Sequence, residues 1–96
     1  MKSVDSEKVI EHKLSEAITA IGGYSIKLAS PYVTGLPDRL CLLPVGRAIF
    51  VELKSTGKKP RKTQLLMHDK LRLLGFKVEV IDTLQGVYDF IESIKC

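Results

Sequence analysis

The sequence predicts an α/β domain in which a mixed sheet carries helices on both faces. First, segments with helical or strand periodicity follow one another in the order α-β-β-β-α-β-α. Second, 96 residues suffice for one modest core and not for two, so a single domain over residues 1–96 is expected. Third, a tight hairpin joins antiparallel strands, whereas a β-α-β passage joins parallel strands by a right-handed crossover. A sheet that contains both connections is mixed.

Amphipathic helices are predicted at both ends of the chain. The first spans Ser3 to Ile21, with Ser3 or Asp5 as its cap, and it ends at two glycines. The last begins after a capping Thr83. Their apolar residues recur at intervals of three and four, as expected for helices packed on a core. These residues are Ile10, Leu14, Ala17, Ile18 and Ile21 in the first helix and Val87, Phe90, Ile91 and Ile94 in the last.

A further helix is predicted from Pro60 to Leu74. Proline suits the first turn of a helix, because the amide that it lacks would have no partner there, and Gly75 suits the end. We expect leucines to form the buried side of this helix. They are Leu65, Leu66, Leu71, Leu73 and Leu74.

Short apolar runs predict four strands, at Tyr24–Ala29, Arg39–Leu43, Ala48–Leu53 and Phe76–Ile81. Only four residues separate the second strand from the third, so we expect a tight hairpin. If the hairpin turns about Val45, residues whose numbers sum to 90 face each other. Asp38 then lies opposite Glu52.

Two carboxylates and a lysine are expected at one end of this hairpin. Glu52 and Lys54 are two residues apart and project from the same face of their strand. Adjacent carboxylates such as Asp38 and Glu52 repel each other unless a cation lies between them, and a hard ion such as Mg²⁺ takes oxygen ligands. A lysine beside that ion can position water or neutralise charge on a phosphorane. The set suits metal-assisted phosphodiester hydrolysis. The alternative is a surface cluster with an ordinary Glu–Lys salt bridge.

The order of these residues resembles a nuclease superfamily. Gly35-x-Pro37-Asp38, then Glu52-x-Lys54, then Gln64 early in the next helix is similar to the PD-(D/E)xK pattern. Within that superfamily the sequence most resembles the VRR-NUC family, including a glutamate on the first helix and a hairpin of this length. The resemblance covers nearly the whole chain. It implies a restriction-endonuclease-like core and Mg²⁺, or Mn²⁺, as the cofactor.

The resemblance also implies a role for each motif residue. Asp38 and Glu52 would hold the metal, together with the backbone carbonyl of Leu53. Lys54 would be the catalytic lysine. Gln64 would help to fix the lysine and its water. The four side chains Asp38, Glu52, Lys54 and Gln64 are therefore the expected catalytic set.

One metal ligand is expected from the first helix. Glu7 is the preferred residue, and Glu11 is its substitute, since the two lie one turn apart on the same face. For either residue alone, an exposed helical glutamate is the alternative. His68 lies four residues after Gln64 and so can share its face, but we expect both His68 and His12 to be partly exposed helix residues.

A basic cluster follows the predicted site. The formal net charge is +4, and the cluster consists of Lys58, Lys59, Arg61 and Lys62. We expect it to clamp a nucleic-acid backbone, where phosphate contacts give affinity without reading sequence. A solvated loop is the alternative.

The expected compartment is the cytoplasm. No apolar run approaches the roughly 20 residues that a membrane span needs. The first residues also lack the apolar stretch of a signal peptide. Cys41 and Cys96 are expected to be reduced thiols, and Cys41 is expected in the core. Neither a CxxC pair nor closely spaced histidines indicate a zinc site.

The expected function is structure-selective cleavage of DNA. The chain has no helix-turn-helix or finger signature, which favours selection by DNA shape. A homodimer would offer two metal sites on a two-fold axis, suited to paired nicks in a branched substrate. The resemblance implies a metal-dependent endonuclease, specifically a Holliday junction resolvase that acts as a dimer. The alternatives are a less selective or restriction-like nuclease, and a DNA-binding module that keeps the fold without cutting.

Overall fold

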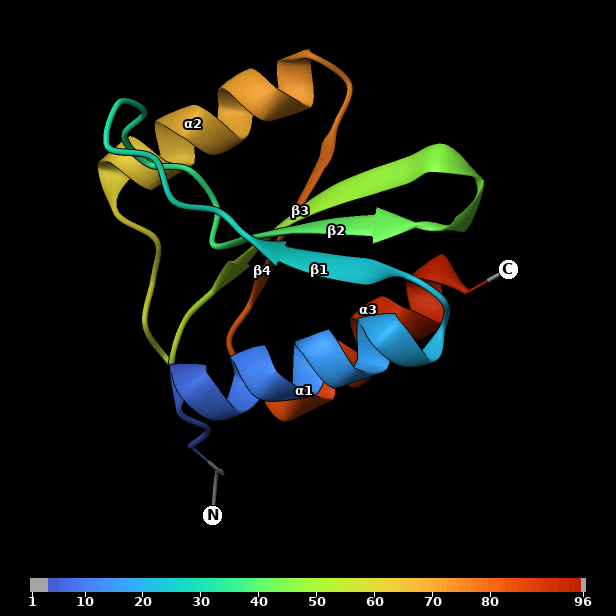
Figure 1. Ribbon diagram of the computed structural model, residues 1–96. Helices are drawn as coiled ribbons and strands as arrows, with labels where there is room; N and C mark the ends of the chain where they lie inside the picture. The colour runs from blue at the N-terminus through green and yellow to red at the C-terminus, as the bar shows by residue number, and fades with distance from the viewer. Residues whose placement is uncertain (1–3, 96) are drawn as a thin grey trace.

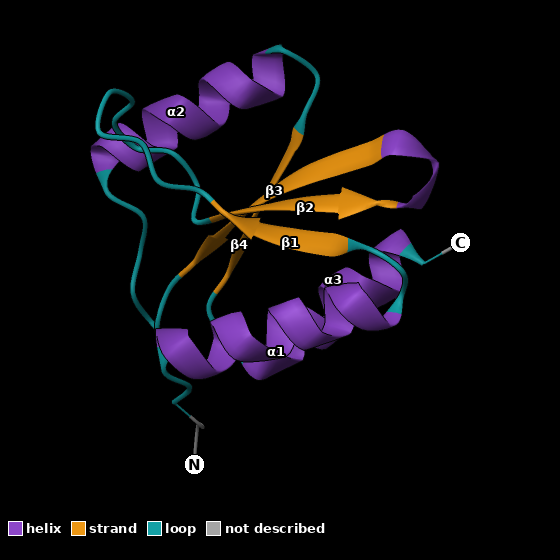
Figure 2. Cartoon of the chain, in the orientation of Figure 1, coloured by secondary structure: helices purple, strands orange, loops and turns teal. Residues whose placement is uncertain are grey.

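The centre of the structure, a computed structural model that describes residues 4–95, is a sheet of four strands (Figures 1 and 2). The strands are β1 (Tyr24–Lys27), β2 (Arg39–Leu43), β3 (Arg47–Leu53) and β4 (Lys77–Ile81). They lie in the order β1-β2-β3-β4. The first three pair antiparallel, and β4 pairs parallel with β3. The predicted mixed sheet is confirmed.

Helices cover both faces of the sheet, as predicted. They are α1 (Glu7–Ala20), α2 (Lys62–Leu73) and α3 (Leu84–Ile94). Figure 1 shows α1 and α3 side by side against one face and α2 on the other. The predicted order α-β-β-β-α-β-α is confirmed. Within residues 4–95, no helix has both the length and the apolar character needed to cross a membrane.

The core lies between the sheet and the α1–α3 pair. The predicted apolar stripes of both helices point into it, and Cys41 is buried there as expected. Burial raises the pKa of the Cys41 thiol to about 11, so this thiol stays protonated at neutral pH. Cys96 lies outside the described residues. The main core residues are Ile10, Leu14, Ile18, Val51, Leu53, Ile81, Val87, Phe90, Ile91 and Ile94.

The start of α1 differs from the prediction. Ser6, in an extended conformation, caps the helix, and its side chain accepts a hydrogen bond from the Val9 amide at 3.2 Å. Asp5 instead accepts a hydrogen bond from the Leu84 amide at 2.8 Å, at the start of α3. Its own amide donates to Oγ1 of Thr56 at 2.8 Å. Asp5 therefore does not cap α1, and Ser3 lies outside the described residues.

The register of the hairpin is as predicted. Leu40 faces Phe50 and Leu42 faces Ala48, so the numbers of paired residues sum to 90. The turn is a short 3₁₀ segment, Pro44–Gly46, in which Val45 has a left-handed backbone with φ of 66°. β3 begins one residue earlier than expected and β1 ends two residues earlier. This register carries the chain before β2 to the end of β3, where the candidate site lies.

The buried side of α2 was predicted wrongly. Leu66 is 55% exposed and Leu73 is 89% exposed, whereas the side chain buried by α2 is His68. The hydrogen bond from Gln64 to the buried Glu52 fixes which face of the helix turns inward. A buried carboxylate needs polar partners, so α2 presents amide and imidazole groups to the sheet rather than leucines.

The start of α2 also differs from the prediction. Arg61 is the N-cap and Lys62 is the first helical residue, so Pro60 lies before the helix rather than in its first turn. Oε1 of Gln64 accepts a hydrogen bond from the Arg61 amide at 2.7 Å. The glutamine thus satisfies a free backbone donor at the helix start while its other end reaches the sheet.

Candidate active site

The loop before β2 brings Asp38 to the end of β3. Oδ2 of Asp38 accepts a hydrogen bond from the Leu53 amide at 2.7 Å, and the Asp38 carbonyl accepts one from the Leu28 amide at 2.9 Å. Gly35 allows the loop to pass close to α2, because a Cβ atom there would lie 2.4 Å from the Thr63 carbonyl oxygen. Gly35 also has φ of +84°, which favours glycine. The GxPD loop therefore sets the position of the aspartate.

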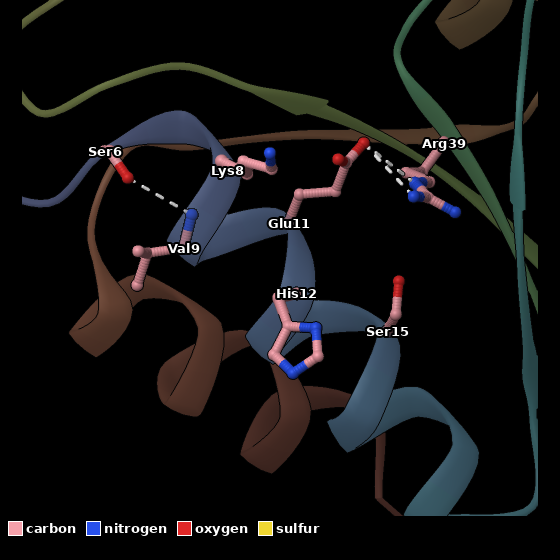
Figure 3. A pocket seen from close by; sticks show the side chains of 7 residues that line it. All are labelled: Ser6, Lys8, Val9, Glu11, His12, Ser15 and Arg39. Atoms are coloured by element: carbon pink, nitrogen blue, oxygen red, sulfur yellow. Dashed lines mark hydrogen bonds and ion pairs between the residues drawn. The ribbon is translucent and has the colours of Figure 1, made fainter.

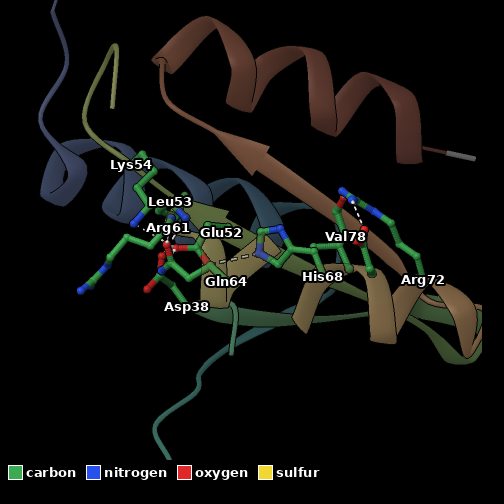
Figure 4. Close-up of polar contacts among 10 residues, drawn as sticks. Asp38, Glu52, Leu53, Lys54, Arg61, Gln64, His68, Arg72 and Val78 are labelled. Atoms are coloured by element: carbon green, nitrogen blue, oxygen red, sulfur yellow. Dashed lines mark hydrogen bonds and ion pairs between the residues drawn. The ribbon is translucent and has the colours of Figure 1, made fainter. Parts of the chain in front are cut away.

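Glu52 is a fully buried carboxylate with partners on both oxygens (Figure 4). Nε2 of Gln64 donates to Oε2 at 2.9 Å. Nζ of Lys54 lies 3.5 Å from the same oxygen. Nε2 of His68 lies 3.5 Å from Oε1. The structure thus brings Glu52, Lys54 and Gln64 together as the sequence predicted, and it adds His68.

Burial and neighbouring charge perturb this carboxyl group. Desolvation, followed by repulsion from Asp38, raises the pKa of Glu52 to about 7, and Lys54 offsets part of that rise. Two carboxylates held this close favour a cation between them. A divalent ion with a preference for oxygen ligands fits the donor set, since Asp38 and Glu52 both offer carboxylate oxygens. The residues present are therefore suited to a hard metal.

Gln64 contacts the carboxylate rather than the lysine. Its amide nitrogen and Nζ of Lys54 both approach Oε2 of Glu52. The Lys54 backbone is fixed by a hydrogen bond from its amide to the Ile81 carbonyl at 3.1 Å. Gln64 therefore acts on Lys54 through the oxygen that they share. The role of the Leu53 carbonyl as a metal ligand stays a prediction.

The glutamates of α1 are not gathered with this site. Both Nε and Nη2 of Arg39 approach Oε2 of Glu11, at 3.2 and 3.1 Å (Figure 3). Glu7 is exposed in the first turn of the helix. Among the described residues, no group of three or more histidine, cysteine or acidic side chains is arranged to hold a metal. A ligand from α1 stays a prediction, and Glu11 would have to leave Arg39 to supply it.

The basic cluster lies on the loop before α2 and on the first residue of that helix, Lys62, and the loop is anchored beside the site. Oγ1 of Thr56 donates to the Asp82 carbonyl at 2.7 Å, and the Gly57 amide donates to Oδ2 of Asp82 at 3.2 Å. The loop leads from Lys54 directly into α2. All four cluster residues are exposed, as phosphate contacts require: Lys58, Lys59, Arg61 and Lys62.

The two histidines differ from each other. His12 is exposed, as expected, and its Nε2 lies 3.7 Å from Oε2 of Glu16. His68 was expected to be partly exposed, but it is fully buried. Desolvation, together with the positive charge of Arg72, lowers the pKa of His68. The signal for its position was the four-residue spacing from Gln64, which places both side chains on one face of α2.

Comparison with known proteins places this geometry in a family. No family profile matches the chain. A curated relative, "Putative nuclease p44" of Acyrthosiphon pisum secondary endosymbiont phage 1, is 42% identical over 83 residues, which cover 86% of this chain and 88% of that protein. A solved structure described as a VRR_NUC domain superposes with a TM-score of 0.86 at 32% identity, over 94% of this chain and 99% of the other.

The chain belongs to the VRR-NUC family. The predicted family and fold are thus confirmed, and the VRR-NUC match extends over nearly the full length of both compared chains. Nuclease folds of the VRR-NUC type typically use a divalent metal. The paired carboxylates of Asp38 and Glu52 supply the oxygen donors that such an ion prefers.

Proposed function

We propose that this VRR-NUC chain is a Mg²⁺- or Mn²⁺-dependent endonuclease that hydrolyses phosphodiester bonds in DNA. The observation that carries the proposal is the convergence of Asp38, Glu52 and Lys54 at the ends of two paired strands. Glu52 is buried, and its Oε2 lies 3.5 Å from Nζ of Lys54. A buried carboxylate with a raised pKa beside a second carboxylate is costly without a cation, which favours a functional site over a surface salt bridge.

The residues divide the work of hydrolysis. Asp38 and Glu52 would hold the divalent ion, which supplies electrophilic assistance to the phosphodiester when bound. Lys54, kept in place by Glu52 and by its backbone bond to β4, can orient a water molecule and neutralise charge that develops on phosphate oxygens. Gln64 holds Oε2 of Glu52, so the lysine and the carboxylate keep a fixed relation.

We further propose that the enzyme selects DNA by shape. The exposed basic cluster leads from Lys54 into α2, so it would contact the phosphates that flank the scissile bond. Contacts of this kind fix position and affinity without reading bases. A four-way junction presents two equivalent strands, and a two-fold dimer of this chain would place one site on each. The proposed activity is therefore Holliday junction resolution by a homodimer.

The surface of α2 supports a dimer. We define the α2 leucine surface as Leu65, Leu66, Leu73 and Leu74, all of which are exposed. Two leucines at each end of the segment flank Asp69 and Lys70, so these four leucines are spaced symmetrically about its centre. In an antiparallel pair of α2 helices, leucines would meet leucines and Asp69 would lie beside Lys70 of the second copy. The apolar stripes of α1 and α3 are buried in the core. The α2 leucine surface is therefore our candidate for the dimer interface.

The test uses purified protein with labelled four-way junction, flap and linear duplex, each with Mg²⁺, Mn²⁺ or EDTA. Paired symmetric nicks in the junction, dependent on metal, are expected. Binding of DNA without any metal-dependent cutting would contradict the enzyme and indicate a DNA-binding module that does not cleave. Equal cutting of all three substrates would indicate a less selective or restriction-like nuclease.

A further inference from the structure

His68 is the buried side chain of α2, and it faces the candidate site (Figure 4). It follows Gln64 by one helical turn. The Gln64 amide donates to Oε2 of Glu52 at 2.9 Å, while Nε2 of His68 lies 3.5 Å from Oε1. The two oxygens of one carboxylate are thus approached by two side chains of the same helix.

The surroundings of the imidazole determine which nitrogen carries its hydrogen. Nδ1 of His68 is buried and has no hydrogen-bond partner among the described residues. When Glu52 is ionised, a hydrogen on Nδ1 would leave a buried donor unpaired and would turn the lone pair of Nε2 toward a carboxylate oxygen. With the hydrogen on Nε2, the ring donates to Glu52, and only the acceptor lone pair of Nδ1 is left without a partner. The second arrangement costs less free energy.

Core packing alone does not explain a histidine at this position. Burying an imidazole costs free energy unless its polar atoms are used, and an apolar side chain would fill the same space without that cost. The contact with Glu52 is the polar interaction that the buried ring makes. The contact with the Glu52 carboxylate is therefore the reason for a histidine at position 68.

We propose that His68 is a positioning residue that fixes the rotation of the Glu52 carboxylate. With Gln64 on one oxygen and His68 on the other, Glu52 meets a divalent ion in a single orientation. The inference rests on the proposed metal-dependent function. Hydrogen-bond partners behind metal ligands typically contribute ~10- to 100-fold to metal affinity. His68 acts through Glu52 and does not touch the substrate.

Mn²⁺ titration of metal-free protein by calorimetry tests this role. His68→Leu keeps an apolar side chain of similar size but removes the donor, and it should weaken Mn²⁺ binding ~10-fold or more. His68→Gln restores a donor near the place of Nε2 and should recover most of the affinity. His12→Leu, on the exposed surface of α1, is the matched control and should bind as the wild type does. Equal affinity in wild type and His68→Leu, or equal losses in both His68 variants, would overturn the role.

Nitrogen NMR of the wild-type imidazoles tests the hydrogen bond without a variant, should His68→Leu fail to fold. At alkaline pH, where Glu52 is ionised and can only accept, the Nε2–H tautomer is expected for His68, and an Nδ1–H tautomer there would refute the contact. The two measurements separate two failures. A wild type that binds no metal contradicts the proposed function, while the tautomer still decides whether His68 holds Glu52. A wild type that binds metal no better than His68→Leu contradicts the positioning role alone.

Discussion

The Leu53 amide donates a hydrogen bond to Oδ2 of Asp38 over 2.7 Å, and this bond ties the loop before β2 to the end of β3. The aspartate is thus held by backbone rather than by a flexible side chain. An amide of the same shape can accept the same hydrogen bond. The position of this residue can therefore be kept while its charge is removed.

Asp38→Asn should abolish metal-dependent cleavage while leaving the fold and much of the DNA binding intact. The substitution removes one of the two charges that would hold the ion. Lys54→Ala should also abolish cleavage, since it removes the cation beside Glu52. Nicking of a labelled four-way junction measures the loss, and a gel shift in EDTA measures binding. Asp89→Asn, exposed on α3, is the control and should cut normally. Retained cleavage in both site variants would refute the site.

Glu52→Gln should change how stability depends on pH in metal-free protein. Desolvation and the Asp38 charge raise the pKa of Glu52 from 4.5 to about 7, so the folded state keeps a proton that the unfolded chain releases in that interval. Wild-type stability should therefore fall as pH rises from 4.5 to about 7. A shift of this size corresponds to a fall of about 3 kcal/mol in the free energy of unfolding. Glu52→Gln has no group to titrate at this position, so its stability should not fall in this way. Urea unfolding in EDTA below and above this interval measures the difference. If the stability difference between wild type and Glu52→Gln were the same below and above this pH interval, the raised pKa would be contradicted.

Metal affinity should rise with pH up to about 7 and then level off. The cation competes with the proton on Glu52, so binding below that pH must release the proton. Calorimetric titration with Mg²⁺ in two buffers of different ionisation enthalpy counts the protons released. About one proton per ion is expected well below the pKa and none well above it. If Glu52→Gln releases no proton on binding the ion, the released proton comes from Glu52. If the release is unchanged, the proton comes from another group.

Lys58→Ala combined with Lys59→Ala should weaken DNA binding and make it less sensitive to salt. Each phosphate contact that is lost should reduce the slope of log affinity against log salt by about 0.9. The double variant should therefore lower the slope by nearly 2 for every DNA sequence tested. Fluorescence anisotropy over a salt series gives the slope. Lys95→Ala, at the end of α3, is the control and should keep the wild-type slope. An unchanged slope in the double variant would mean that the loop is solvated and does not contact phosphates.

Leu66→Glu should convert a dimer to a monomer. Leu66 is 55% exposed on α2, and a carboxylate there would be buried against the second copy. Light scattering coupled to size exclusion measures the mass of each variant. Val9→Glu is the matched control, since Val9 is 51% exposed on α1, and it should leave the mass unchanged. A wild-type monomer at all concentrations would contradict the dimer, and a dimeric Leu66→Glu would place the interface elsewhere.

The hairpin was predictable because its register depends on local spacing. Residues 38 and 52 can be placed opposite each other from the length of one tight turn, and strand periodicity places Lys54 beside them. The apolar stripes of α1 and α3 were predictable for a similar reason, since each has a regular helical repeat that matches one core.

The inward face of α2 was not predictable from hydrophobicity. Its leucines occupy most sides of the helix, so the pattern did not define one buried face. The structure turns Gln64 and His68 inward because the buried Glu52 carboxylate on the preceding strand, β3, needs donors there. The Asp5 contacts were also hidden, because they join segments 51 and 79 residues apart in the chain. Long-range polar contacts of this kind leave no local periodicity.

Gly35 determines how closely two parts of the candidate site approach each other. The loop that carries Asp38 rests on the Thr63 backbone at the start of α2, with no room for even a methyl group between them. The aspartate from the loop and the glutamine from the helix therefore keep a separation set by direct contact between two backbones. An alanine at this position would force the loop and α2 apart and widen the space between Asp38 and Gln64, while leaving every side chain of the site chemically unchanged.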